Sequence, residues 1–335
     1  MRKQIRNEFR LKLSLSIAAG SRFLIADEKD KEKDNNRPHD EPQVSRGVKS
    51  NGEYYLPGSS LKGVLRSRAE YIAGALSGGM GVCHPFDQQL TDPKPACGER
   101  FNLRDKAGQL SLPQRYVEAC PACQLFGHTF EAGRLRVTDF VLDKNTALKT
   151  VVQTHAPIDR MSGGVSNIRN AAARTIFTVE YLTQAAFTGE LILENFSLWQ
   201  IGWLGFLLQD LRDGLIQVGH KQTTGAGKMR IDSASAAVRV LGLMPAAGSL
   251  KGLLVGLTDD KQAYSLAEEQ LQIPGLAWRR DNFWWSAEFA NAASLELLWA
   301  ATRSRANQTL TRYRFPEAMQ LPALAALAAK MEAQA

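Results

Sequence analysis

The stretch YYLPGSSLKGVLRSRAEYIAGAL, residues 54–76, contains the pattern that decides the fold. It begins as a strand, turns at Pro57 and Gly58, and continues as a helix whose apolar positions recur at helical spacing. The first turn of a helix carries amide groups that have no partner within the helix and that attract phosphate. The candidate phosphate contacts at this turn are Ser59, Ser60, Lys62 and Arg66. The alternative is an N-capped helix whose basic face is simply solvated.

The composition of the 335-residue chain is typical of a globular protein with an anionic partner. Apolar residues make up 44% of the chain, which is enough for a packed core. The formal net charge is +7, which favours nucleic acid as that partner. The alternation RLKLSLSI near the N-terminus indicates a strand rather than a signal peptide, and no apolar run approaches the roughly 20 residues that span a membrane. We therefore expect a cytoplasmic protein without a membrane partner.

All four cysteines fall within one part of the chain, which is also rich in glycine and proline. In a reducing compartment, clustered cysteines more often bind metal than form disulfides. The CxxC pair Cys120 and Cys123, together with Cys83 and Cys97, predicts four thiolates around a structural zinc ion. His84 is an alternative ligand in place of one cysteine. The remaining possibility is four free thiols.

The order of the predicted elements indicates an α+β domain with a ferredoxin-like core. Outside the opening stretch, strands are expected at residues 8–18, 133–143 and 187–196, and on both sides of a polar tip within 151–182. The segment 197–219 has the pattern of an amphipathic helix, and a strand follows it after a glycine-rich loop. A strand, a helix, further strands, a second helix and a last strand are the order of a split βαβ domain.

Two segments outside this core have a different character. Residues 26–53 are highly charged and nearly free of apolar side chains, so we expect a surface loop. After residue 240, helices are expected in SLAEEQLQI, SLELLWAATRSRANQ and ALAALAAKMEAQA, which would form a C-terminal helical extension. The motif WRRDNFWW, residues 278–285, is either a partner surface or a set of core aromatics with flanking arginines.

The loop GHKQTTGAGK, residues 219–228, is a second candidate phosphate-binding turn. Glycines allow close approach of the backbone to a phosphate, and the basic and hydroxyl side chains add charge and hydrogen bonds. The candidate contacts in this loop are His220, Lys221, Thr223, Gly225, Gly227 and Lys228. The spacing is not that of a Walker loop, so nucleotide hydrolysis is not expected. The alternative is a plain hairpin turn.

Four of these stretches together resemble the RAMP superfamily, specifically the backbone subunits of type III CRISPR effector complexes. They are YYLPGSSLKGVLRS, CPACQLFG, HAPIDRMSGGVSNIRNAA and GHKQTTGAGK, in the order of the family. The resemblance covers about residues 8–231, and residues 240–335 fall outside it.

The resemblance implies an RRM-like RAMP core over residues 1–239, with a zinc-bound insertion at 77–128, a thumb hairpin at 155–174 and a C-terminal extension at 240–335. It also implies a backbone subunit that binds guide RNA (crRNA) and its paired target RNA, beside copies of itself and other effector subunits. Base pairing with the guide would then set sequence specificity. The thumb would contact RNA through two apolar wedges and three arginines, namely Met161, Ile168, Arg160, Arg169 and Arg174.

The segment DEPQVSR, residues 40–46, is similar to the family's cleavage motif and places Asp40 at the catalytic position. A carboxylate with Mg²⁺ or Mn²⁺ would help a 2′-hydroxyl to attack the adjacent phosphate. The alternative is a non-cutting RNA-binding scaffold that works with a separate nuclease. A more distant possibility is a metal-binding protein unrelated to RNA, which would be isolated free of RNA.

Overall fold

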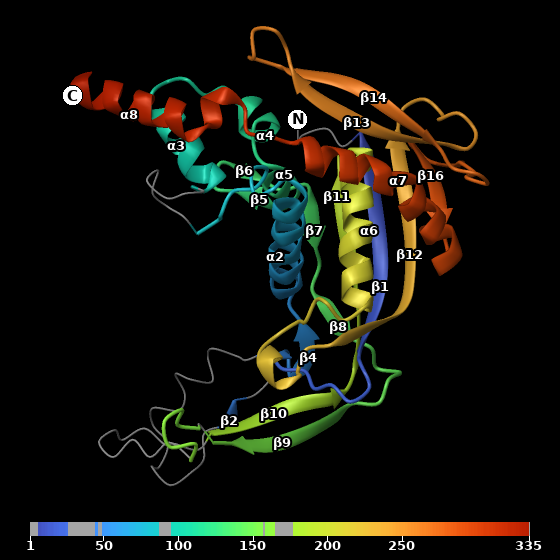
Figure 1. Ribbon diagram of the computed structural model, residues 1–335. Coiled ribbons are helices and arrows are strands. Elements are labelled where there is room, and N and C mark those ends of the chain that lie inside the picture. The colour runs from blue at the N-terminus through green and yellow to red at the C-terminus, as the bar shows by residue number, and fades with distance from the viewer. Residues whose placement is uncertain are drawn as a thin grey trace.

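One large antiparallel sheet forms the centre of the molecule (Figure 1). The computed structural model describes residues 6–25, 44–45, 49–86, 95–156, 158–164 and 177–334. Along the sheet the strand order is β15-β16-β12-β1-β11-β8-β4-β3, and β7 also pairs with β11. The strands are β1 (Asn7–Ile17), β3 (Lys49–Ser50), β4 (Glu53–Leu56), β7 (Leu135–Val137), β8 (Phe140–Leu142), β11 (Ala186–Glu194), β12 (Met229–Leu241), β15 (Arg279–Asp281) and β16 (Trp284–Phe289). The mixed α+β class predicted from the sequence is confirmed.

Strand β1 lies in the middle of this sheet and has the alternating pattern that the sequence predicts. It pairs with β11 on one side and with β12 on the other, both antiparallel. Phe9, Leu11 and Leu15 are fully buried on one face, whereas Lys12 is exposed on the other. The sheet therefore has one apolar face that must be covered.

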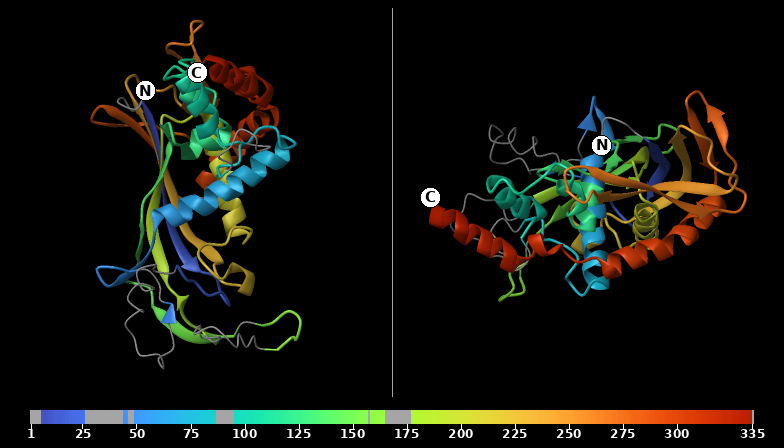
Figure 2. Two further views of the ribbon diagram at one scale, coloured as in Figure 1. Left: turned by 90° about the vertical axis from the view of Figure 1, so that its left-hand side faces the viewer. Right: turned by 90° about the horizontal axis from the view of Figure 1, so that it is seen from above.

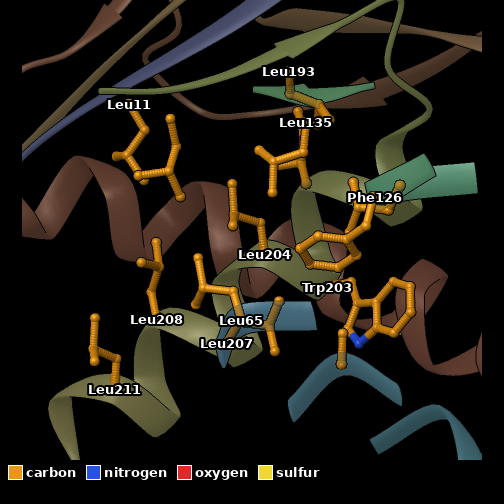
Figure 3. Close-up of a cluster of buried hydrophobic side chains, with 14 of the residues drawn as sticks. Leu11, Leu65, Phe126, Leu135, Leu193, Trp203, Leu204, Leu207, Leu208 and Leu211 are labelled. Atoms are coloured by element: carbon orange, nitrogen blue, oxygen red, sulfur yellow. The ribbon is translucent and has the colours of Figure 1, made fainter. Parts of the chain in front are cut away.

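Three helices cover this apolar face (Figure 2, left). They are α2 (Gly58–Leu76), α6 (Leu198–Arg212) and α7 (Ala292–Arg312). Helix α2 buries Leu61, Leu65, Ala69 and Ala73, which are spaced by four residues and so form one stripe. Figure 3 shows Leu65 of this stripe among leucines of α6 and strand residues such as Leu11 and Leu193.

Helix α6 packs unusually close to α7 because two of its residues are glycines. A Cβ atom at Gly202 would lie 2.3 Å from the carbonyl oxygen of Thr302, and one at Gly205 would lie 2.9 Å from the Trp299 ring. The start of α6 carries a capping box formed by Ser197 and Gln200. The helix predicted within residues 197–219 is confirmed over Leu198–Arg212, but it is buried on almost all sides rather than amphipathic, because α7 covers the face that the sheet leaves open.

The cysteine-containing part of the chain folds into short helices and a small hairpin beside α2. The elements are α3 (Cys97–Lys106), α4 (Gln114–Val117), α5 (Pro121–Phe126), β5 (Gly127–His128) and β6 (Glu131–Ala132). Helix α8 (Leu321–Gln334) contacts α3, and the short helix η3 (Glu317–Met319) precedes it. The C-terminus thus closes over this part of the molecule (Figure 1).

A second sheet extends from one end of the large sheet (Figure 1). Its strands are β9 (Lys149–His155), β10 (Phe177–Gln184) and the two-residue β2 (Val44–Ser45). Strands β9 and β10 pair antiparallel, and β2 pairs parallel to β10. The two strands predicted within residues 151–182 are confirmed as β9 and β10.

The C-terminal segment differs from the predicted helical extension. The sequence SLAEEQLQI lies in strand β14 (Tyr264–Gln272), which pairs along its whole length with β13 (Ser249–Leu257). Glu269 accepts a hydrogen bond of 2.5 Å from the Leu198 amide at the start of α6 and forms a 3.2 Å ion pair with Arg305 of α7. These non-local contacts override a local sequence that favours helix. The helices predicted in the last 45 residues are confirmed as α7 and α8, and none of the described helices has the length and apolarity to cross a membrane.

Candidate metal centre and nucleic-acid interface

The four cysteines come together at one buried point although they belong to three separate segments. Cys83 follows α2, Cys97 begins α3, and Cys120 and Cys123 lie at the start of α5. All four sulfur atoms lie within 4.8 Å of one another. The Sγ atom of Cys83 is 3.6 Å from that of Cys123 and 3.7 Å from that of Cys120. His84, the alternative ligand, has an exposed side chain and is not a member of this cluster.

These distances fit a tetrahedral metal ion. Zinc–sulfur bonds of about 2.3 Å place the sulfurs of a tetrahedral site about 3.8 Å apart. Within the cluster the shifts of pKa oppose one another. Burial raises the pKa of the Cys97 thiol and a hydrogen bond with Cys120 raises that of Cys123, whereas hydrogen bonds from the other three cysteines outweigh burial at Cys120 and lower its pKa well below the usual value. The cluster is therefore close enough to bind a metal ion and is compatible with structural zinc. Four protein ligands leave no open position for catalysis.

Arg66, a predicted RNA contact, lies instead against this cysteine cluster. Its guanidinium donates hydrogen bonds to the Cys123 sulfur at 3.5 Å and to the Gly127 carbonyl oxygen at 2.8 Å. It also forms a 2.8 Å ion pair with Glu70, one helical turn further along α2. Four thiolates around a divalent ion carry a net charge of −2, so a neighbouring cation is favourable. This role could not be predicted from the sequence, because Arg66 is separated from Cys123 and Gly127 by 57 and 61 residues along the chain.

Replacing Arg66 by methionine is expected to weaken metal binding about tenfold to a hundredfold, because outer-sphere hydrogen bonds hold metal ligands in place. Competition with a chromophoric chelator measures this affinity, and the absorption bands of the cobalt-loaded protein should shift as well. Arg68→Met is the matched control, because Arg68 is on the same helix but pairs with Asp210 of α6 at 2.7 Å. Equal metal affinity in the two variants would contradict the role of Arg66.

The first turn of α2 is already partly occupied by a carboxylate. The Gly58 amide donates a 2.8 Å hydrogen bond to Asp139 Oδ1, in the turn between β7 and β8. Ser59 is exposed, whereas Ser60 and Lys62 are half-buried. Asp139 therefore takes the place that an anion would fill at the first amide. The hydroxyl groups of Ser59 and Ser60, rather than that amide, are the candidate anion contacts of this turn.

The glycine-rich loop is held in shape by the segment that follows β1. The amides of His220 and Gly227 donate to the carbonyl oxygens of Leu24 and Arg22 at 2.7 and 2.6 Å. Gly225 and Gly227 have φ angles of 86° and 92°, in the region that favours glycine, and the 3-10 helix η2 (Gln222–Thr224) lies between Lys221 and Gly225. The outer part of the loop is exposed from Gln222 to Gly225, including Thr223, and so are His220 and Lys228.

The base of the β9–β10 hairpin meets the same loop. Leu24, Val179, Tyr181 and Ala226 form a small buried cluster that joins the hairpin to the loop. Phe23 pairs with Leu182 in an isolated bridge next to this cluster. The glycine-rich loop and the hairpin are therefore fixed relative to each other.

We call this contact between the glycine-rich loop and the base of the β9–β10 hairpin the joint. Several basic side chains lie around it. The Arg22 guanidinium lies 5.2 Å from the centre of the Tyr181 ring and donates to Gln153 and to the Thr224 carbonyl oxygen. Burial lowers the pKa of His155 below its usual value, and the cations Lys221 and Arg22 lower it further. Sequence reasoning missed Arg22 because only the fold brings it to the hairpin.

Residues 158–164, in the connection between β9 and β10, form a tight polar turn that presents an apolar side chain. Asp159 Oδ1 accepts hydrogen bonds from the amides of Met161 and Ser162 at 2.9 and 2.7 Å, which lower the pKa of this carboxyl group. Met161 is 98% exposed, and Ile158 and Arg160 are exposed beside it. Three other predicted thumb residues, Ile168, Arg169 and Arg174, lie outside the described residues, as does Asp40.

We call Arg22, His155, Arg160, Lys221 and Lys228 the basic end. Figure 1 shows the first turn of α2, next to β4, and the glycine-rich loop at the end of the large sheet from which β9 and β10 extend. The cysteine cluster, α3 and α8 lie toward the other end of α2. Basic side chains beside the exposed Gly225 and the exposed Met161 are suited to a single-stranded polyanion with flat bases.

Comparison with known families agrees with this arrangement. No curated protein matches the chain. The family model of the RAMP superfamily matches residues 18–230, which is more than half of the chain and includes α2, the cysteine cluster, the hairpin and the glycine-rich loop. The protein therefore belongs to the RAMP superfamily.

Proposed function

We propose that the protein is a crRNA-binding backbone subunit of a type III-like CRISPR effector complex, which holds guide RNA and its paired target RNA. Membership of the RAMP superfamily supports a CRISPR-associated RNA-binding protein. The observation that carries the proposal is the joint between the glycine-rich loop and the β9–β10 hairpin, where Arg22, Lys221 and His155 meet. Lys228 and Arg160 extend this charge along the exposed surface.

We infer that the RNA backbone follows the basic end while the thumb tip separates bases. The exposed Gly225 would allow the chain to approach a phosphate, and Ser59, Ser60, Lys62, His220 and Thr223 would add contacts. Gly227, which was predicted as a contact, is buried against the Val218 carbonyl oxygen and is left out. Met161, almost fully exposed on a turn fixed by Asp159, is the apolar wedge. Ile168, Arg169 and Arg174 would continue this contact. Arg66 is left out of the RNA contacts because its hydrogen bonds go to the cysteine cluster.

We also propose that the core is ferredoxin-like. The strands β12, β1 and β11 are neighbours, and β7 and β8 follow β11. Helix α2 connects β1 toward β7, and α6 connects β11 to β12. This is the order of a split βαβ fold, with both connecting helices on one face of the sheet.

The metal is proposed to be zinc, bound by Cys83, Cys97, Cys120 and Cys123. When bound, zinc would cross-link three segments of the chain, and it would supply no chemistry to the reaction. The proposed partners are crRNA, target RNA, further copies of this chain and other effector subunits, in the cytoplasm. Purification of the native complex followed by sequencing of its RNA tests this assignment, and a preparation free of RNA would contradict it.

Target cleavage is proposed to depend on Asp40. Val44, four residues later, pairs with Thr178 of β10, so the chain that follows Asp40 returns to the hairpin. The carboxylate would accept the proton of a 2′-hydroxyl, whose oxygen would attack the neighbouring phosphate. The bond from phosphorus to the 5′-oxygen would break, which leaves a 2′,3′-cyclic phosphate and a 5′-hydroxyl that takes its proton from water. A divalent ion, Mg²⁺ or Mn²⁺, would supply stabilisation of the phosphate charge. The alternative function is an inactive scaffold that works with a separate nuclease.

Asp40→Ala is expected to reduce target cleavage by about a hundredfold or more, the usual contribution of a general base, and to leave target binding unchanged. The measurement is cleavage of labelled target RNA by the reconstituted complex, with binding followed in parallel. Asp34→Ala is the matched control, because it removes one acid from the same charged segment. Unchanged cleavage in the Asp40 variant would favour the scaffold.

A further inference from the structure

A pocket of about 440 Å³ lies at the end of the molecule away from the basic end. Its walls come from the loop after α2 and from the segment that leads into α8. Met80, Val82, Leu321 and Pro322 make these walls mostly apolar. Pockets of this size hold small molecules when a few polar groups fix the orientation of the ligand.

Arg100 is the first such polar group. The residue is 4% exposed, and the Cζ atom of its guanidinium lies 4.2 Å from the centre of the Phe315 ring. Its Nε atom donates to the Pro95 carbonyl oxygen at 2.9 Å, and Nη1 donates to the Met319 carbonyl oxygen. The third nitrogen, Nη2, has no hydrogen-bond partner in the part of the chain that the structure describes. This guanidinium lines the pocket with one donor group to spare.

Arg314 is the second polar group and lies at the mouth of the pocket. Its Nη1 atom donates to the carbonyl oxygens of Thr311 and Tyr313 at 2.9 and 2.7 Å, and the residue is exposed. Across the described ranges, no carboxylate forms an ion pair with either Arg100 or Arg314. A buried cation without a counter-ion is unfavourable, so an anion that enters the pocket gains more than it would at the surface.

We propose that this pocket binds a small amphiphilic anion, that is, a molecule with one carboxylate, sulfonate or phosphate group on an apolar body. The acidic group pairs with Arg100 Nη2 and Arg314, and the apolar body lies against Met80, Val82 and Leu321. A nucleotide fits less well because its hydroxylated sugar would face apolar walls. Helix α2, 19 residues and therefore about 28 Å long, separates this pocket from the proposed RNA-binding turn at Pro57.

The test uses anilinonaphthalene sulfonate, a fluorescent apolar anion, with the full-length protein. The dye should bind with saturating fluorescence, and octanoate should displace it more effectively than octanol, which has an apolar chain of the same length but no charge. Arg314→Gln should weaken binding of both anions about tenfold, which is about 1.4 kcal/mol. Met80→Glu, which adds a negative charge at a residue that is 63% exposed, should abolish binding.

Arg312→Gln is the matched control, because Arg312 is exposed at the end of α7, two residues before Arg314, and does not line the pocket. Dye affinity in this variant should equal that of the unchanged protein, and RNA affinity should be the same in all three variants. The proposal is overturned if octanol competes as well as octanoate, or if Arg314→Gln and Arg312→Gln bind the dye equally.

Discussion

Replacing Cys123 with serine is expected to remove the bound metal and to lower the free energy of unfolding by about 4 kcal/mol or more. The four sulfurs join the loop after α2, the start of α3 and the start of α5 at one buried point. Without the ion, buried thiols would remain at this point. Among the described residues, Arg66 is the cation that contacts one of them, Cys123. Metal analysis and denaturant unfolding measure the two effects.

The matched control for this variant is Ala122→Ser. Ala122 is fully buried on the same helix turn, so the substitution also places a hydroxyl group in the core but leaves all four sulfurs in place. It should keep one metal ion per chain and lose less stability than Cys123→Ser. If the two variants lose equal stability while both keep their metal, the cluster does not hold this part of the protein together.

The loss of metal should also loosen the C-terminus. The Tyr313 hydroxyl donates a 3.1 Å hydrogen bond to the Glu118 carbonyl oxygen, and Arg100 holds the Met319 carbonyl oxygen. Arg104 of α3 and Glu118, two residues before Cys120, form a buried ion pair. These contacts depend on the position of α3, which Cys97 fixes at its first residue.

Removing three cations of the basic end is expected to weaken RNA binding about a hundredfold at about 0.1 M salt. The variant is Arg160→Ala, Lys221→Ala and Lys228→Ala. Each phosphate contact with single-stranded nucleic acid contributes about 0.7 to the slope of log affinity against log salt, so the slope should fall by about 2. Titration of a labelled single-stranded RNA at several salt concentrations measures both quantities.

The control removes the same charge from the other end of the molecule. Lys106, Arg312 and Lys330 are exposed, and their combined replacement by alanine should leave the salt slope unchanged. Equal losses in the two triple variants would mean that net charge, rather than the basic end, sets RNA affinity.

The parts of the fold that the sequence predicted are those with local signals. Helix α2 has an apolar stripe and a turn of proline and glycine before it, and the CxxC spacing with two further cysteines predicted the cluster at the four positions where it occurs. Strand β14 was predicted wrongly, because its pairing with β13 and the contacts of Glu269 lie far away in the sequence.

The candidate site was predictable in its segments and less so in its partners. The glycine-rich loop and the hairpin were expected to be separate contacts, and their shared cluster of Leu24, Tyr181 and Ala226 is visible only in the fold. Arg66 looked like one more basic residue on the first turns of α2. Its side chain nevertheless reaches Cys123, although Lys62 lies only one turn earlier on the same helix. Arg22 gave no signal, because nothing near it in the sequence indicates the Tyr181 ring that it contacts.

Ultraviolet crosslinking of the native RNA-bound protein, followed by mass spectrometry of the crosslinked peptides, tests the central claim most directly. RNA should crosslink to peptides that contain residues 158–164 and 219–228, on the two sides of the joint between hairpin and loop. Crosslinks confined to the helix-free face of the large sheet, around Lys12, would contradict the claim that this joint holds the RNA.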